Sequence, residues 1–336
     1  MPDLPYIPIL ALIFAFLMGA AILAYVLLDG YDLGVGMLMP AADAREQNRM
    51  VNSIGPFWDA NETWLVLGVG ILLVAFPVAH GVILQGLYLP VAAMLVGLML
   101  RGVAFEFRLK AEGWHRELWN WLFWFGSFVA SFAQGYMLGR TITGFLPGFL
   151  PFLFGLLVGA SVCGGYVLLG ASWLVLRTDG ALQRKALAWA RWGLLWVGLG
   201  VLLVSVATPL ASDTVRHKWF DFPRTLALML LPLASAAAWL LVWRSTRRIE
   251  RDPGASHALP FAGAVAMFAL AFAGLAYSLF PYLVIDQMTI WQAATHPSAL
   301  RVTFYGAVVV LPFLIAYTVF AYRVFRGKAR AGMYEH

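Results

Sequence analysis

The amino-acid sequence predicts an all-α polytopic membrane protein, and its composition, its long apolar runs and its distribution of basic residues all lead to that prediction. Of the 336 residues, 62% are hydrophobic and only 12% are charged, whereas soluble domains contain about 25% charged residues. Helices that are apolar on every side are typical of membrane spans. This composition excludes a soluble globular enzyme, a disordered chain and a secreted module built on disulfides.

Nine apolar runs are long enough to cross a hydrocarbon core of about 30 Å as helices. They occupy residues 7–28, 57–77, 82–100, 118–138, 152–176, 192–211, 226–243, 260–285 and 302–322. A membrane β-barrel would instead show strands of about ten residues with alternating polarity. The sequence therefore predicts nine transmembrane helices. A division into four helices, four helices and one extra helix is compatible with this pattern, although periodicity does not show it.

The basic residues predict the orientation of these spans. With the N-terminus outside, the inner segments 29–56, 101–117, 177–191, 244–259 and 323–336 contain 18 of the 23 Lys and Arg residues. The outer segments contain only Arg140, Arg216, Lys218, Arg224 and Arg301. This bias follows the positive-inside rule. The net charge of +6 is therefore explained by the topology of the spans and does not indicate nucleic-acid binding. We expect the N-terminus outside and the C-terminus inside.

Two carboxylates, Asp59 and Glu62, lie well inside the second apolar run, near its inner end. They are three residues apart and therefore share one helix face. One interpretation is that the helix dipole favours acidic residues near an N-terminus. The other, which we favour, is a pair that handles protons, because an ionisable group in a span is costly and usually functional.

Asp29 and Asp32 follow the first apolar run, on the same inner side as Asp59. If the helix stops at Gly30, Asp32 can cap the following turn, and this structural role explains well why an Asp is found at position 32. Asp29 is less well explained in this way, because a carboxylate at a helix C-terminus opposes the dipole. Asp29 is therefore the stronger functional candidate of the two.

Other polar residues are expected to have structural roles. Arg101, Glu106 and Arg108 end the third run and predict a snorkelling, ion-paired turn at the interface. Ser127, Ser131 and Gln134 form one polar stripe on the fourth span, where hydrogen bonds between helices are at least as plausible as contact with a ligand. In the fifth run, Gly155 and Gly159 form a GxxxG pair that predicts close helix packing.

No histidine lies in the middle of a predicted span. His80, His217 and His296 fall in outer segments, and His115, His257 and His336 in inner ones. Haem in a membrane protein is usually held by axial ligands that project from helices, and zinc or iron–sulfur spacings are absent from the sequence. We therefore expect this chain to bind no haem and no metal by itself.

Four blocks of sequence, in this order and spacing, resemble subunit II of cytochrome bd-type quinol oxidases. They are Leu-Asp-Gly-Tyr-Asp-Leu-Gly-Val-Gly-Met-Leu at 28–38, Pro-Phe-Trp-Asp-Ala-Asn-Glu-Thr-Trp-Leu at 56–65, Arg-Gly-Val-Ala-Phe-Glu-Phe-Arg at 101–108, and Trp-Phe-Gly-Ser-Phe at 124–128. The match covers the first 140 or so residues, and the second half is matched mainly by its spans. Tyr31, Ala60 and the pair Glu62 and Thr63 resemble the cyanide-insensitive branch of the family more closely.

The resemblance implies a respiratory terminal oxidase of the bacterial inner membrane that oxidises quinol and reduces dioxygen to water. In that family, subunit I carries haem b and haem d, or haem b only, and the quinol-oxidising loop. Subunit II, its heterodimeric partner, lacks haem, and some complexes contain a small accessory subunit. The implied fold is a single transmembrane domain over 1–336 with four-helix bundles at 7–138 and 152–285 and a peripheral helix at 302–322.

The resemblance also implies roles for individual residues. Asp29 and Asp59 match positions in a proton path from the cytoplasm that helps to generate a proton motive force. Glu62, which pairs with Asp59 on the same helix face, is assigned to the same path. Trp64 matches a residue near the proposed access of oxygen from lipid, or at the contact with the partner; from the residues alone it would be assigned to packing.

Two other functions stay open at this stage. One is a secondary transporter with Asp59 and Glu62 as its coupling-ion site, although transporters tend to place charges near the midplane in both halves. The other is a purely structural assembly subunit in which the acidic residues only cap helices. Co-purification of a haem-bearing partner would favour an oxidase subunit or a structural assembly subunit over a transporter.

The predicted topology can be tested with reporter fusions. A reporter that is active only outside the cytoplasm should be silent when fused after His336, because the positive-inside rule places this end inside. A reporter that is active only in the cytoplasm should work at the same position. The opposite pattern would show that a span has been miscounted.

Overall fold

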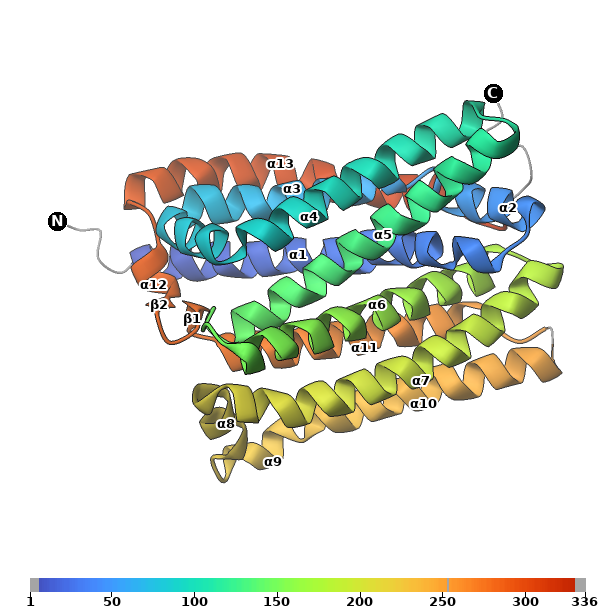
Figure 1. Ribbon diagram of the computed structural model, residues 1–336. Coiled ribbons are helices and arrows are strands. Elements are labelled where there is room, and N and C mark those ends of the chain that lie inside the picture. The colour runs from blue at the N-terminus through green and yellow to red at the C-terminus, as the bar shows by residue number, and fades with distance from the viewer. Residues whose placement is uncertain (1–5, 253, 330–336) are drawn as a thin grey trace.

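The computed structural model describes residues 6–252 and 254–329, and most of them are helical. The long helices run side by side, and the short elements lie at their ends (Figure 1). In chain order the elements are α1 (Tyr6–Leu38), η1 (Met39–Ala41), α2 (Ala44–Ile54), α3 (Trp58–Ala75), α4 (Pro77–Lys110), α5 (Gly113–Ile142), α6 (Phe149–Arg177), α7 (Gly180–Ala211), α8 (Asp213–Phe220), α9 (Arg224–Leu228), α10 (Leu230–Arg251), α11 (Ala258–Leu279), β1 (Tyr282–Val284), β2 (Met288–Thr289), α12 (Ile290–Ala293) and α13 (Pro297–Val324).

The helices confirm the predicted class, an all-α membrane protein. Eight stretches of the described chain are helical, long and apolar enough to cross a membrane: α1, α3, α4, α6, α7, α9 with α10, α11 and α13. Helix α5 covers the predicted fourth span and is 30 residues long, but it is not among the eight. Its apolar stretch is interrupted by Ser127, Ser131 and Gln134. The count of nine spans and their division into two bundles therefore stay predictions.

Helices α1 and α6 form the centre of the assembly. Helix α1 packs against α3, α5 and α6, whereas α6 packs against α5, α7 and α11 as well. Helix α6 is the most deeply buried of the eight candidate spans. Helix α13 lies along α3 and also touches α1 (Figure 1). The first and second halves of the chain therefore meet along α1, α5 and α6.

Glycines allow these central helices to touch through their backbones. A Cβ atom added to Gly34 would lie 1.8 Å from the carbonyl oxygen of Tyr166, and one added to Gly170 would lie 2.4 Å from the amide nitrogen of Val35. The predicted close packing at Gly155 and Gly159 is confirmed, because Cβ atoms added there would lie 2.8 Å from the Tyr136 ring and 3.0 Å from the Phe132 ring of α5. Small residues are typical of such close contacts between membrane helices.

Several helices extend beyond the predicted spans. Helix α1 continues to Leu38, so the expected end at residue 28 is wrong, and α4 continues to Lys110 instead of ending near residue 100. Hydropathy falls at the first charged residue, but a helix can continue where its charged side chains find partners on neighbouring helices. At α11 the prediction is too long, because the helix ends at Leu279 and Pro281 leads into the β1–β2 hairpin.

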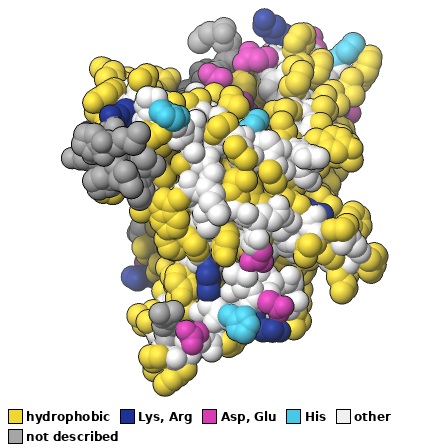
Figure 2. Space-filling model, turned by 90° about the vertical axis from the view of Figure 1, so that its left-hand side faces the viewer, with side chains coloured by type: hydrophobic (Ala, Val, Ile, Leu, Met, Phe, Trp, Pro, Cys, Tyr) yellow, Lys and Arg dark blue, Asp and Glu magenta, His cyan; other side chains and the backbone are white. Residues whose placement is uncertain are grey.

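The two ends of the assembly differ in structure and charge. Helix α1 begins at one end and α13 finishes at the other, where α2 also lies (Figure 1). The opposite end carries α8, α12 and the β1–β2 hairpin. Figure 2 views this second end, whose surface is mostly hydrophobic or uncharged with scattered charged side chains. The end that carries α2 is the predicted inner, basic end.

Helix α2 is tied to this inner end by a capping box. The Asp43 side chain accepts hydrogen bonds from the backbone N–H groups of Arg45 and Glu46, at 3.0 and 2.9 Å, and the Glu46 carboxylate accepts one from the Asp43 N–H. These backbone donors hold the pKa of Asp43 below its usual range. Lys185 of α7 forms an ion pair with Glu46 at 2.6 Å. The loop between α1 and α3 is therefore fixed to both halves of the chain.

Candidate functional site

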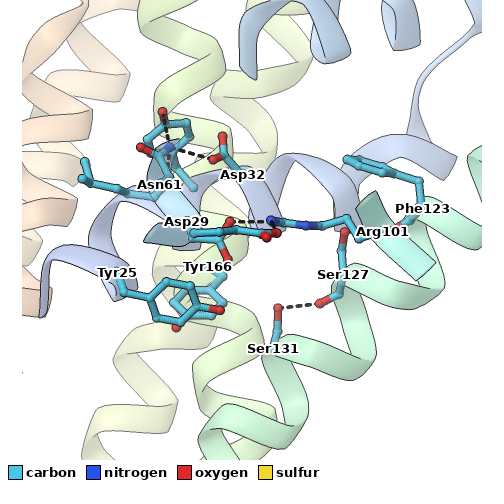
Figure 3. A network of polar contacts seen from close by, with 12 residues as sticks. Tyr25, Asp29, Asp32, Asn61, Arg101, Phe123, Ser127, Ser131 and Tyr166 are labelled. Atoms are coloured by element: carbon cyan, nitrogen blue, oxygen red, sulfur yellow. Dashed lines mark hydrogen bonds and ion pairs between the residues drawn. The ribbon is translucent and has the colours of Figure 1, made fainter. Parts of the chain in front are cut away.

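A buried cluster of charges joins three helices in the first half of the chain. Arg101 of α4 is 1% exposed, and its Nη1 lies 2.6 Å from the Oδ1 of Asp29 on α1, which is fully buried. The Nη2 of Arg101 forms an ion pair with Glu62 of α3, whose side chain is 29% exposed. Figure 3 shows Arg101 reaching from its own helix toward Asp29. The expectation that Arg101 snorkels to the interface is therefore wrong.

The charges of this cluster do not balance when every group is ionised. One guanidinium faces two carboxylates, and the Arg side chain remains protonated in proteins. A buried charge is tolerated when it is paired. The cluster becomes neutral when one of its two carboxyl groups holds a proton. A third carboxyl group, that of Asp32, is also fully buried one turn further along α1, so the interior around Arg101 holds more carboxyl groups than cations.

A second network lies one turn further along α1. The Asn61 side chain of α3 donates hydrogen bonds to Asp32 at 2.8 Å and to the Tyr31 hydroxyl at 3.0 Å. The Tyr322 hydroxyl of α13 donates to the Asn61 side-chain oxygen at 3.2 Å and lies 2.5 Å from the Tyr31 hydroxyl. The expectation that Asp32 caps a turn is therefore wrong. Asp32 lies inside α1, and Asn61 donates a hydrogen bond to it (Figure 3).

A third group of polar side chains connects α1, α5 and α6. Gln134 donates a hydrogen bond to the Tyr25 hydroxyl at 2.8 Å and accepts one from the Tyr166 hydroxyl at 2.6 Å. The expected hydrogen bonding between helices is thus confirmed for Gln134. Ser127 and Ser131 instead donate to carbonyls of their own helix, four residues back, each at 2.7 Å.

Asp59 and Trp64 lie on opposite faces of α3. Asp59 is in the first turn of the helix and is exposed, so it is not part of the buried pair at Arg101. Trp64 is 9% exposed and packs against Ala21 and Tyr25 of α1. Its indole N–H has no hydrogen-bond partner among the described residues. Trp64 therefore faces the interior of this chain.

The end of α4 departs from the expected ion-paired turn. Arg108 is 2% exposed, and its guanidinium donates to amide oxygens, to Asn120 of α5 at 2.5 Å and to Asn48 of α2 at 2.7 Å. Glu106 is exposed on the other side of the helix. Arg108 therefore ties α4 to α5 and α2 through neutral partners, which is why its charge does not require a carboxylate.

The described histidines stand at helix ends and do not fit a pair of haem ligands. His80 and His115 lie in first turns, His257 and His296 precede helices, and His217 is in the short α8. His336 lies outside the described residues. Within the described part of the chain, no group of three or more His, Cys, Asp or Glu residues could hold a metal ion. The absence of haem from this chain stays a prediction.

The fold and the buried cluster define a polytopic α-helical membrane protein with ionisable groups linked across its interior helices. Residues 10–325 match the sequence profile described as "Cytochrome bd terminal oxidase subunit II". The chain belongs to this family.

Individual relatives agree with this assignment. The chain is 28% identical to cytochrome bd-I ubiquinol oxidase subunit 2 of Escherichia coli strain K12, over 94% of this chain and 93% of the relative. It is 29% identical to cytochrome bd ubiquinol oxidase subunit 2 of Bacillus subtilis, over 93% of this chain and 94% of the relative. The solved bd oxidase of Geobacillus thermodenitrificans contains a chain with the same fold, with a TM-score of 0.78 at 17% identity, covering 94% of this chain and 98% of that one.

Membership of the family gives the chain its general function. It is a subunit of a quinol:oxygen oxidoreductase of the respiratory chain and works in complex with subunit I in the inner membrane. The haem cofactors of such complexes reside mostly in subunit I. The resemblance to the family is thereby confirmed, and it extends over both halves of the chain.

Removing Arg101 should destabilise the chain strongly. Arg101→Met leaves Asp29 buried without its cation, and breaking a buried pair from one side costs about 3–5 kcal/mol. Adding Asp29→Asn should recover part of this loss, because the unpaired charge is then gone. The measurement is the thermal unfolding midpoint of the purified complex.

Arg244→Met is the matched control for this prediction. Arg244 is exposed on α10, and exposed substitutions usually change stability by less than about 0.5 kcal/mol. If Arg101→Met unfolds at the same temperature as Arg244→Met, the buried cluster does not hold the three helices together.

Proposed function

We propose that this chain takes up protons from the inner face of the membrane and delivers them toward the oxygen-reducing haem site in subunit I. The observation that carries the proposal is a series of carboxylates of decreasing exposure. Asp59 is exposed on the first turn of α3, Glu62 one turn further on is 29% exposed, and Asp29 on α1 is fully buried. The series leads from the surface into the interior.

Arg101 gives this series a mechanism. It contacts both Glu62 and Asp29, so a proton that moves from one carboxyl group to the other leaves the net charge of the cluster unchanged. Each of these groups can both accept and release a proton, as an acid–base relay requires. Asp59, which lies nearest to the surface, is the group proposed to accept protons from water.

The consequence is a contribution to the proton motive force. Water formation consumes protons, and quinol oxidation releases them. If the consumed protons come from inside and the released ones go outside, each turnover moves charge across the membrane, which is worth about 2.3 kcal/mol per charge at 100 mV. The orientation that this requires places the end that carries α2 in the cytoplasm, in agreement with the basic bias of the sequence.

The exposed face of α3 is proposed to contact subunit I. This face carries Asp59 together with apolar side chains such as Val66, which is 72% exposed. A carboxylate that faces hydrocarbon is costly, whereas a partner subunit can supply polar groups. Such a contact would also support assembly of the complex. Trp64 lies on the opposite, buried face, so this proposed contact does not include it, and its proposed place near the access of oxygen is supported by the resemblance alone.

The haem groups of subunit I, haem b with haem d or haem b alone, supply the redox chemistry, with quinol as the electron donor. The residues of this chain hold and move protons, and they pack against subunit I and, in some complexes, a small accessory subunit.

Replacing Asp59 should slow turnover without preventing assembly. Asp59→Asn keeps the shape and hydrogen-bonding capacity of the side chain but cannot ionise, and Asn is tolerated near a helix N-terminus about as well as Asp. The haem spectrum of the complex should stay intact, while quinol oxidase activity should fall about tenfold or more, as loss of an acid–base group usually costs. Oxygen consumption by the purified complex measures this.

Glu106→Gln is the matched control, because Glu106 is also an exposed carboxylate on a long helix but lies outside the series. It should leave oxygen consumption unchanged. Full turnover by an assembled Asp59→Asn complex would refute the proton-uptake role of Asp59.

The transporter alternative has its own test. If this chain dissipates an ion gradient when subunit I is absent, that result would favour the coupling-ion site of a transporter instead.

A further inference from the structure

A cavity at the inner end of the molecule combines basic and aromatic side chains. Its volume is about 290 Å³. It is lined by residues from the end of α6, the residue before α3, the end of α13 and the segment after α13. The lining residues are Phe57, Trp173, Leu176, Arg177, Tyr322, Arg326, Gly327 and Lys328. Three of these are cationic and none is acidic. The proton series on α1, α3 and α4 does not account for this cavity.

Arg177 is built into the wall of the cavity. It is only 5% exposed, its Nη2 donates to the carbonyl oxygen of Phe325 at 2.7 Å, and its Nε has no hydrogen-bond partner among the described residues. Its guanidinium lies 5.2 Å from the ring centroid of Trp173 and 5.6 Å from that of Phe57. The aromatic rings hold the guanidinium in place through cation–π contacts. Its Nε is itself buried, so Arg177 contributes a fixed positive charge to the wall of the cavity.

Lys328 brings a second fixed cation to the same place. Its ammonium group donates to the carbonyl oxygens of Thr178 at 2.6 Å and Val175 at 3.4 Å, which leaves one of its three N–H bonds free of these contacts. Burial lowers the pKa of Lys328, and the charges of Arg177 and Arg49 lower it further, whereas Asp179 raises it. Asp179 is itself ion-paired with Arg49, so the positive charge around the cavity is not compensated.

We propose that this cavity binds the phosphate group of an anionic phospholipid from the inner leaflet. A phosphate accepts several hydrogen bonds from Arg and Lys donors, and pairs with a guanidinium are among the strong ones. Basic pockets between membrane helices on the cytoplasmic side bind such headgroups. The position of the cavity at the ends of α6 and α13 corresponds to headgroup depth, and Phe57, Trp173 and Leu176 offer an apolar wall to the glycerol and upper acyl chain.

A bound headgroup would touch the interior through Tyr322. This residue lines the cavity, and its hydroxyl bonds to Asn61, which in turn holds Asp32. The lipid would also fix the segment after α13 against the end of α6, where Ala329 already donates a backbone hydrogen bond to the Arg177 carbonyl at 2.7 Å. The site therefore links lipid composition to the packing of α13.

The test is a lipid titration of the purified, delipidated complex, followed by native mass spectrometry. The probes are dioleoyl-phosphatidylglycerol, dioleoyl-phosphatidylcholine and inorganic phosphate. The variants are Arg326→Gln and the double variant Arg326→Gln with Lys328→Gln. Arg323→Gln is the matched control. Arg323 is an exposed arginine at the end of α13, close in sequence to Arg326, but it does not line the cavity.

The proposal expects a phosphatidylglycerol molecule bound by the wild type in preference to phosphatidylcholine. Each lost cation should weaken its binding about fivefold, so the double variant should lose about 25-fold while Arg323→Gln changes nothing. Strong competition by inorganic phosphate alone would support the anion site but assign it to a soluble phosphate. Equal binding of both lipids, or equal binding of phosphatidylglycerol by the wild type and all variants, would overturn the proposal.

Discussion

Arg101 places one positive charge among the interior helices, and the arrangement of the first half of the chain depends on how that charge is paired. Its guanidinium contacts Asp29 on α1 and Glu62 on α3 while its backbone belongs to α4. An unpaired guanidinium at 1% exposure would cost several kcal/mol. The three helices therefore have to keep a fixed register. The same constraint places two carboxyl groups around one cation, which is the arrangement that the proposed proton relay uses.

Backbone contacts at glycines make this pairing geometrically feasible. Gly34 and Gly170 bring α1 directly against α6, so α1 can lie in the centre with its carboxylates turned toward α3 and α4. The network of Asn61, Asp32 and Tyr322 then joins α13 to the same centre. The chain can in this way contribute buried acid–base groups to the oxidase, whose haem cofactors reside mostly in subunit I.

The sequence predicted the membrane class, the approximate position of most spans and the carboxylates near the inner end, because hydropathy and charge are local properties. It did not predict that α1 continues past Asp29 and Asp32, because the partners that allow this, Arg101 and Asn61, come from other helices. The prediction that Arg101 snorkels to the interface was wrong for the same reason. Asn61 could have been suspected as a third polar residue between Asp59 and Glu62, whereas Tyr322 gave no signal in an otherwise apolar run.

The central claim is that the cluster around Arg101 binds and releases a proton during turnover, and infrared difference spectroscopy of the assembled complex tests it most directly. The reduced-minus-oxidised spectrum should contain a band from a protonated carboxyl group that shifts in deuterated water. This band should disappear or move in Glu62→Gln and in Asp29→Asn but persist in Glu106→Gln. A band that is identical in all three variants would show that neither carboxyl group of the cluster changes its protonation, and would contradict the account.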